Sequence, residues 1–164
     1  MPSVTTRIAT MDDYEAICRL LAQADRHHAE ILPDVFQTFT GPTRPRALVA
    51  EFIEAEDADY LLAEIEGEPV GLLNLRKQAR PSYPMFRSHE FAMIHNMVVD
   101  EAHRRRGIGT ALLEEAKRWT RDRGLTAVQL GVWAGNAPAV SFYRKHGFRV
   151  LTQRMELRLD PASS

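Results

Sequence analysis

One stretch limits the possible folds of this chain more than any other. The apolar residues from Glu90 to Asp100 predict a buried strand, which leads through a short turn into an amphipathic helix over Gly107–Arg123. Gly124 follows that helix and suits the left-handed position that ends many helices. The apolar side of the helix consists of Leu112, Leu113, Ala116 and Trp119. A central strand that passes directly into a packed helix predicts an α/β protein.

The remaining segments predict further strands and helices around this unit. Alternation favours strands over Ser3–Ala9, Thr126–Val132 and Phe148–Leu159, and a hairpin of Asp59–Ile65 with Pro69–Leu75. Helices are expected after a capping pair of Thr10 and Asp13, over Arg46–Ala55, and over Asn136–His146, whereas His27–Pro45 and Arg80–His89 are expected to be irregular. The pattern predicts one mixed, mostly antiparallel sheet flanked by helices (α+β type). A chain of 164 residues suits one domain, 1–164.

Composition narrows the classes of partner. The formal net charge of −1 offers no basic field for nucleic acid. Cys18 is the single cysteine, so no intrachain disulfide is expected and a reducing, cytoplasmic compartment is favoured. The start of the chain does not resemble a signal peptide, and no apolar run approaches the roughly 18 residues of a membrane span. The histidines show no metal-ligand spacing, so no metal is expected.

The turn before the helix of Gly107–Arg123 predicts an anion site. Arg104, Arg105 and Arg106 stand at the helix start, where the helix dipole disfavours cations but attracts anions. Glycines at 107 and 109 let a ligand approach the main chain, and the first N–H groups of a helix point outward. A phosphate or pyrophosphate fits this arrangement. The alternative is a solvated basic turn before an ordinary helix.

Two common nucleotide motifs are absent from this turn. The P-loop pattern does not occur, and Leu112 stands where the third glycine of a dinucleotide-binding fingerprint belongs. A nucleotide-phosphate binder of another kind stays open as a competing interpretation.

These residues resemble the GNAT superfamily of acyl-CoA-dependent N-acyltransferases. The family carries [Q/R]-x-x-G-x-[G/A] after its fourth strand, and the sequence reads Arg104-Arg105-Arg106-Gly107-Ile108-Gly109. The family also carries an asparagine before a helix, an aromatic-Tyr pair and a Gly-Phe, which match Asn136, Phe142-Tyr143 and Gly147-Phe148. The order of elements matches from about Tyr60 to the end of the chain.

The resemblance implies a fold with splayed fourth and fifth strands and acetyl-CoA as co-substrate. It implies that main-chain amides from Arg105 to Thr110 hold the CoA pyrophosphate, and that the strand at Met97, Val98 and Val99 holds the pantetheine arm. It places Asn136 on the other side of that arm and Tyr143 near the sulfur. The predicted cofactor-binding residues are Met97, Val98, Val99, Arg104, Arg105, Arg106, Gly107, Ile108, Gly109, Thr110 and Asn136. Because dimers are common in the family, a homodimer is a further expectation.

Attack on a thioester needs a neutral amine, whereas an alkyl amine with a pKa of roughly 10.4 is mostly protonated at neutral pH. Family members often place a carboxylate base where this chain has Met93 or His95. Alternation predicts that Met93, His95, Met97 and Val99 share one face of the strand. His95 is therefore the candidate base, against the alternative of a histidine that only supports the sheet. Glu90 is a weaker alternative base.

Tyr143 is the candidate proton donor to the departing thiolate, against the alternative of a core aromatic. The predicted reaction is transfer of an acetyl group to a primary amine by direct attack in a ternary complex, with a small-molecule amine favoured. A protein N-terminus or lysine as acceptor, and a non-catalytic acyl-CoA-binding regulatory module, stay open. The missing carboxylate supports the second of these.

Overall fold

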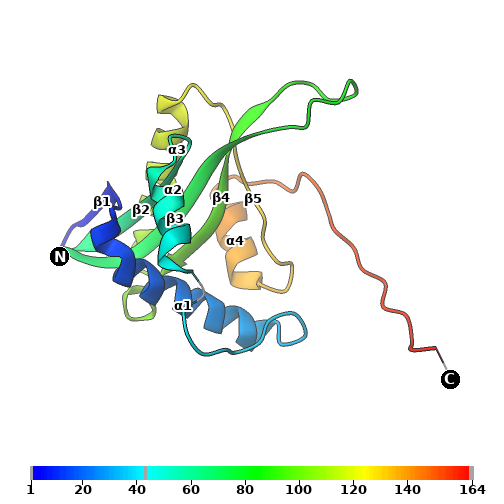
Figure 1. The fold of residues 1–164 in the computed structure, drawn as a ribbon, viewed down its shortest axis with the longest axis horizontal. Helices are drawn as coiled ribbons and strands as arrows, with labels where there is room; N and C mark the ends of the chain where they lie inside the picture. Colours follow the sequence, from blue (N-terminus) through cyan, green and yellow to red (C-terminus); the bar gives the residue numbers. More distant parts are fainter. Residues whose placement is uncertain (1, 43, 163–164) are drawn as a thin grey trace. The chain divides into compact units, whose positions relative to one another are not determined.

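A computed structural model describes residues 2–42 and 44–162. The chain divides into two compact units, residues 1–131 and 132–164. In the first unit, five strands form one sheet in the order β1-β2-β3-β4-β5 (Figure 1). The strands are β1 (Val4–Ile8), β2 (Ala58–Ile65), β3 (Glu68–Ala79), β4 (Glu90–Val99) and β5 (Val128–Leu130). The pairs from β1 to β4 are antiparallel and β4–β5 is parallel, which confirms the predicted mixed, mostly antiparallel sheet.

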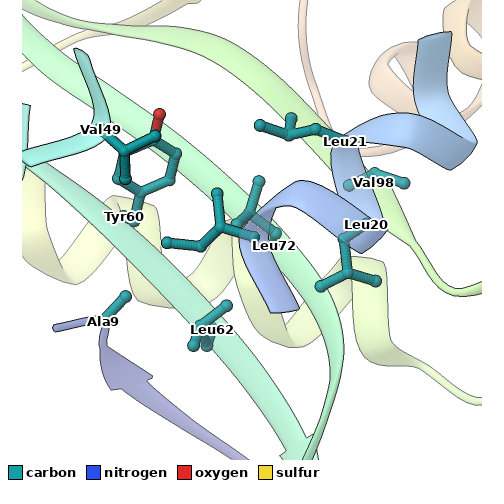
Figure 2. Packing of buried hydrophobic residues seen from close by; sticks show 9 residues of the cluster. Ala9, Leu20, Leu21, Val49, Tyr60, Leu62, Leu72 and Val98 are labelled. Carbon is teal, nitrogen blue, oxygen red and sulfur yellow. The ribbon is translucent and has the colours of Figure 1, made fainter. Parts of the chain in front are cut away.

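Helices cover both faces of this sheet. The helices α1 (Tyr14–Ile31) and α2 (Arg46–Glu54) pack on one face, where apolar side chains from both meet those of the strands (Figure 2). That cluster contains Ala9, Ile17, Leu20, Leu21, Val49, Tyr60, Leu62, Leu72 and Val98. The helix α3 (Ile108–Asp122) packs on the other face through the predicted residues Leu112, Leu113, Ala116 and Trp119, all buried.

Local sequence signals set several of the element ends. Thr10 and Asp13 form the predicted capping box around a short 3-10 turn (Met11–Asp13) that leads into α1. Glu66 and Gly67 join β2 to β3 and both have positive φ, 52° and 81°, as the commonest two-residue hairpin turn requires. Gly124 has a φ of 70° just beyond α3, as expected from its position.

A β-bulge interrupts β4 at His95. Asn96 pairs with Asn74 of β3 and Ile94 pairs with Leu75, so His95 is the extra residue on β4. The bulge makes the expected alternation wrong. The His95 ring lies edge-on to Phe52 of α2, centroids 6.1 Å apart, whereas Val99 pairs with Gly71 on the α3 face. The two side chains therefore point to opposite faces of the sheet.

Several predicted elements differ from the structure. The helix α1 continues to Ile31, past the expected irregular start at His27. The fifth strand is shorter than predicted. The expected strand over Phe148–Leu159 is wrong, because residues 148–162 have no regular secondary structure. Among the described residues, no helix has both the length and the apolar character needed to cross a bilayer.

The second unit contains α4 (Ala137–Lys145) with Asn136 as its N-cap, as predicted. The Asn136 side-chain oxygen accepts a hydrogen bond from the Ala139 N–H at 3.4 Å. Gly147 has a φ of 90°, which follows the end of this helix.

Candidate functional site

Residues Arg104 to Gly107, which precede α3, are exposed and have an unusual backbone. Arg105 has a φ of 62° and Gly107, the N-cap of α3, has a φ of 76°. The N-cap of α3 makes no side-chain hydrogen bond to the helix, and the first N–H groups of a helix in general point outward from its end. A Cβ at Gly107 would have no atom within 4 Å. Together these features leave the main chain of Arg104 to Gly107 accessible, and the anion site expected there stays a prediction.

Packing beneath the loop fixes the start of α3. Ile108 is 1% exposed and lies on Gly71 of β3. A Cβ at residue 71 would be only 2.7 Å from Cγ2 of Ile108 and 3.1 Å from Cδ1 of Leu112. The absence of a side chain at Gly71 therefore allows the first turn of α3 to approach the sheet closely.

Asp100 anchors the turn that precedes the loop. Its carboxylate, in a residue 8% exposed, accepts hydrogen bonds from Arg19 at 2.8 Å, Gln23 at 3.2 Å and the Ala102 N–H at 2.9 Å, and lies 3.3 Å from Nδ1 of His103. Burial alone would raise the pKa of this carboxyl, but these hydrogen bonds together lower it. The charged carboxylate therefore joins α1 to the end of β4.

The bulge at His95 also decides which backbone groups face the open edge of β4. Strand β5 pairs with β4 only over Ala92–Ile94. The Asp100 N–H donates to Val70 of β3 at 2.8 Å, so by alternation the N–H and C=O groups of Met97 and Val99 point away from β3. They lie along the part of β4 that, among the described strands, β5 does not pair with. This arrangement suits a ligand that binds like a neighbouring strand.

His95 lies beside the ring of Phe52 and the positive charge of Arg76. Partial burial lowers the pKa of its ring, and Arg76 lowers it further. The ring is therefore neutral at pH 7, the state that a base needs. Asn96 donates from Nδ2 to Oδ1 of Asn74 at 3.0 Å, which joins β4 to β3 beside the bulge. Glu90 lies 3.0 Å from Nζ of Lys77, so the alternative base is engaged in an ion pair.

In the second unit, Tyr143 packs between two aromatic rings. The centroids of Phe142 and Phe148 each lie 5.5 Å from that of Tyr143, in T-shaped contacts. Burial raises the pKa of Tyr143 to about 12, so its hydroxyl keeps its proton at neutral pH. Tyr143 is therefore able to donate a hydrogen bond but is a weak acid.

Two residues beside His95, Arg76 and Phe52, were not predicted from the sequence to belong to the site. The Arg76 guanidinium lies 4.8 Å above the ring of Phe52, which also contacts His95. No local motif signals this group, because it depends on the register of β3 with β4 and on the packing of α2. Among the described residues, no group of three or more metal-ligating side chains is gathered.

Known proteins share the sequence pattern of this chain. The acetyltransferase (GNAT) family matches over residues 25–148. The chain is 30% identical to the L-amino acid N-acetyltransferase AaaT of Escherichia coli over 156 residues, which is 92% of this chain and 85% of AaaT. It is 32% identical to an uncharacterized N-acetyltransferase of Methanocaldococcus jannaschii, covering 58% of this chain and 41% of that protein. It is 37% identical to a streptothricin acetyltransferase of Escherichia coli, covering 57% and 48%. The chain thus spans less than half the length of the last two.

Solved structures share its fold. A tetramutant of the BH1408 protein from Bacillus halodurans superposes with a TM-score of 0.88 at 27% identity, covering 94% of this chain and 99% of that one. The aminoglycoside N-acetyltransferase AAC(6')-Iy, solved in complex with CoA, superposes with a TM-score of 0.71 at 14% identity over 97% and 96% of the two chains, a likeness of fold alone. The fold and the motifs agree, and the chain belongs to the acetyltransferase (GNAT) family.

Proposed function

We propose that this chain transfers an acetyl group from acetyl-CoA to the primary amine of a small molecule, by direct attack in a ternary complex. The observation that carries the proposal is the exposed loop at the start of α3, whose outward N–H groups adjoin the unpaired edge of β4. Two of the relatives support a small acceptor, because their names specify L-amino acids and streptothricin.

The loop before α3 and the strand β4 bind different parts of the cofactor. The N–H groups of Arg105 to Thr110 bind the pyrophosphate, and the side chains of Arg104, Arg105 and Arg106, all exposed, add positive charge around it. The backbone of Met97 and Val99, on either side of Val98, binds the pantetheine arm. We assign to Asn136, whose side-chain oxygen caps α4, the contact with the same arm that the family resemblance implies.

The chemistry needs a proton to leave the amine before attack. The neutral ring of His95 accepts it, directly or through a water molecule. The backbone N–H of Val99 polarises the thioester carbonyl. The amine nitrogen then bonds to the carbonyl carbon and the carbon–sulfur bond breaks. The second N–H proton, lost as the amide forms, passes to the departing thiolate, and His95 releases the first proton to solvent.

Tyr143 stabilises the departing sulfur. A thiol has a reference pKa near 8.5, so full proton transfer from a phenol of pKa about 12 is uphill. Donation of a hydrogen bond to the thiolate is the role that fits this acidity. This refines the proton-donor role expected from the sequence.

The second candidate function is an acyl-CoA-binding module without turnover, because neither Met93 nor His95 supplies a carboxylate. A thiol-release assay with acetyl-CoA separates the two functions. The panel contains L-amino acids, simple alkyl amines, an aminoglycoside, and peptides that offer an N-terminus or a lysine. Release with a small amine supports the proposal, release with the peptides alone moves the acceptor to proteins, and binding of acetyl-CoA without release for any amine favours the module. The homodimer and the cytoplasmic location stay predictions.

A further inference from the structure

The Arg76 guanidinium has hydrogen-bonding capacity that the protein does not use. Its Nε is buried and has no hydrogen-bond partner among the described residues. The carboxylate of Asp57 lies 3.4 Å from this Nε but forms no hydrogen bond with it. The Arg76 side chain is 34% exposed, so solvent or a ligand can reach it.

Arg76 also lies beside the candidate base. It pairs across the strands with Met93, two residues before the bulge at His95. Its guanidinium stacks on the Phe52 ring with 4.8 Å from Cζ to the centroid, while the His95 ring meets the same ring edge-on. Phe52 therefore holds the cation in place next to the imidazole.

We propose that Arg76 binds the carboxylate of the acceptor, so that the site favours α-amino acids over amines that lack an acidic group. The inference rests on the proposed function and names its substrate class. A guanidinium presents a planar fork of donors that matches a carboxylate in a bidentate geometry. A carboxylate bound there and an α-amine, one carbon away, place the nucleophilic nitrogen near His95.

The position of Arg76 separates this anion site from that of the cofactor. Along β4, Met93 and Val99 are six residues apart, or about 20 Å. The loop that receives the pyrophosphate follows Val99, whereas Arg76 is opposite Met93. Asp57 lies on the Nε side of the guanidinium and offsets part of its charge.

The test compares each L-amino acid of the panel with the amine that lacks its carboxylate and with its neutral amide. The Arg76→Gln variant is expected to lower kcat/KM for the amino acid at least tenfold, which corresponds to about 1.4 kcal/mol, mainly through KM. The same variant is expected to change kcat/KM for the matched amine by less than threefold. The Arg76→Lys variant keeps the charge but loses the planar fork of donors. Its kcat/KM for the amino acid is expected to lie between those of the wild type and of Arg76→Gln. Rates are taken at pH 8, where His95 is neutral in every variant.

The control variant is Lys77→Gln, which removes one positive charge from the next position of β3 and an ion pair with Glu90. This variant is expected to change kcat/KM for the amino acid and for the matched amine by the same factor. Equal losses for both acceptors in Arg76→Gln would show that Arg76 only supports His95, and would overturn the inference. So would a wild-type protein that neither binds nor acetylates amino acids.

Calorimetry keeps this test independent of turnover. Binding of the amino acid to the CoA-saturated protein is measured for the wild type and for Arg76→Gln. If no amine releases thiol but the wild type binds the amino acid at least tenfold more tightly than the variant, the proposed function fails and the carboxylate site stands. If thiol is released from simple amines and amino acids do not bind, the function stands and the carboxylate site fails.

Discussion

The close contact between Gly71 and the first turn of α3 makes Gly71→Ala a sharp test of how the cofactor loop is positioned. The added Cβ would lie 2.7 Å from Cγ2 of Ile108, so about 0.7 Å of movement is needed to reach 3.4 Å, where ordinary contact begins. Cγ2 is attached directly to a branched Cβ, so it has little rotamer freedom with which to give way. The helix start must therefore shift.

Two consequences of known size follow from this shift. Overpacking of a tight core costs about 1–3 kcal/mol of unfolding free energy. A shift of roughly 0.7 Å takes a hydrogen bond of about 2.9 Å beyond the useful range. Because a hydrogen bond to a charged group contributes about 1.5–3 kcal/mol, acetyl-CoA affinity should fall about tenfold or more.

Urea unfolding and calorimetric titration with acetyl-CoA measure these two effects. Gly131→Ala is the matched control, because a Cβ there would meet no atom within 4 Å and its φ is not in the left-handed region. In an Ile108→Ala background, which removes Cγ2, Gly71→Ala should lose most of its additional effect. If Gly71→Ala has wild-type stability and acetyl-CoA affinity, the close packing does not set the position of the loop.

The other predictions concern single groups of the site. Gly107→Glu should abolish CoA binding, because it puts a negative charge against the pyrophosphate. Gly107→Ala, which adds only the strain of a φ of 76°, should keep measurable binding. Retained micromolar binding of CoA by the Glu variant in calorimetry would refute the anion site. The His95 ring should titrate below 6.5 in an NMR pH series, with partial burial as the main cause, and Arg76→Gln should raise that pKa toward 6.5. Because folding lowers the pKa of His95, the stability linked to this residue is fully present above pH 6.5 and is lost as the pH falls toward the folded-state pKa. A measured pKa at or above 6.5 would contradict this reasoning. Tyr143→Phe should lower kcat about tenfold or more with little change in KM for acetyl-CoA, because it removes a hydrogen bond to the leaving sulfur; an unchanged kcat excludes that role.

Much of the fold follows from local signals in the sequence. The capping box at Thr10, the turn at Glu66 and Gly67, and the stop at Gly124 each act within a few residues, and each lies where it was predicted. The packing of α3 follows from apolar periodicity in the same way. The anion site at the start of α3 stays a prediction, which rests on the local physical meaning of arginines and glycines at a helix start.

Features that depend on distant partners were not predictable. The bulge at His95 arises from the register of β4 against β3, and no glycine or proline marks it in the sequence. The segment Phe148–Leu159 alternates like a strand, but alternation does not supply the partner that a strand needs, and Met155 and Leu157 are 90% and 83% exposed. Arg76 reaches Phe52 and His95 only through tertiary packing.

A crystal structure with CoA bound tests the central claim most directly. The account predicts the diphosphate within about 3.2 Å of the N–H groups between Arg105 and Thr110, with the pantetheine arm hydrogen-bonded to the backbone of Met97 and Val99. A diphosphate bound elsewhere, with these amides left to water, would contradict it.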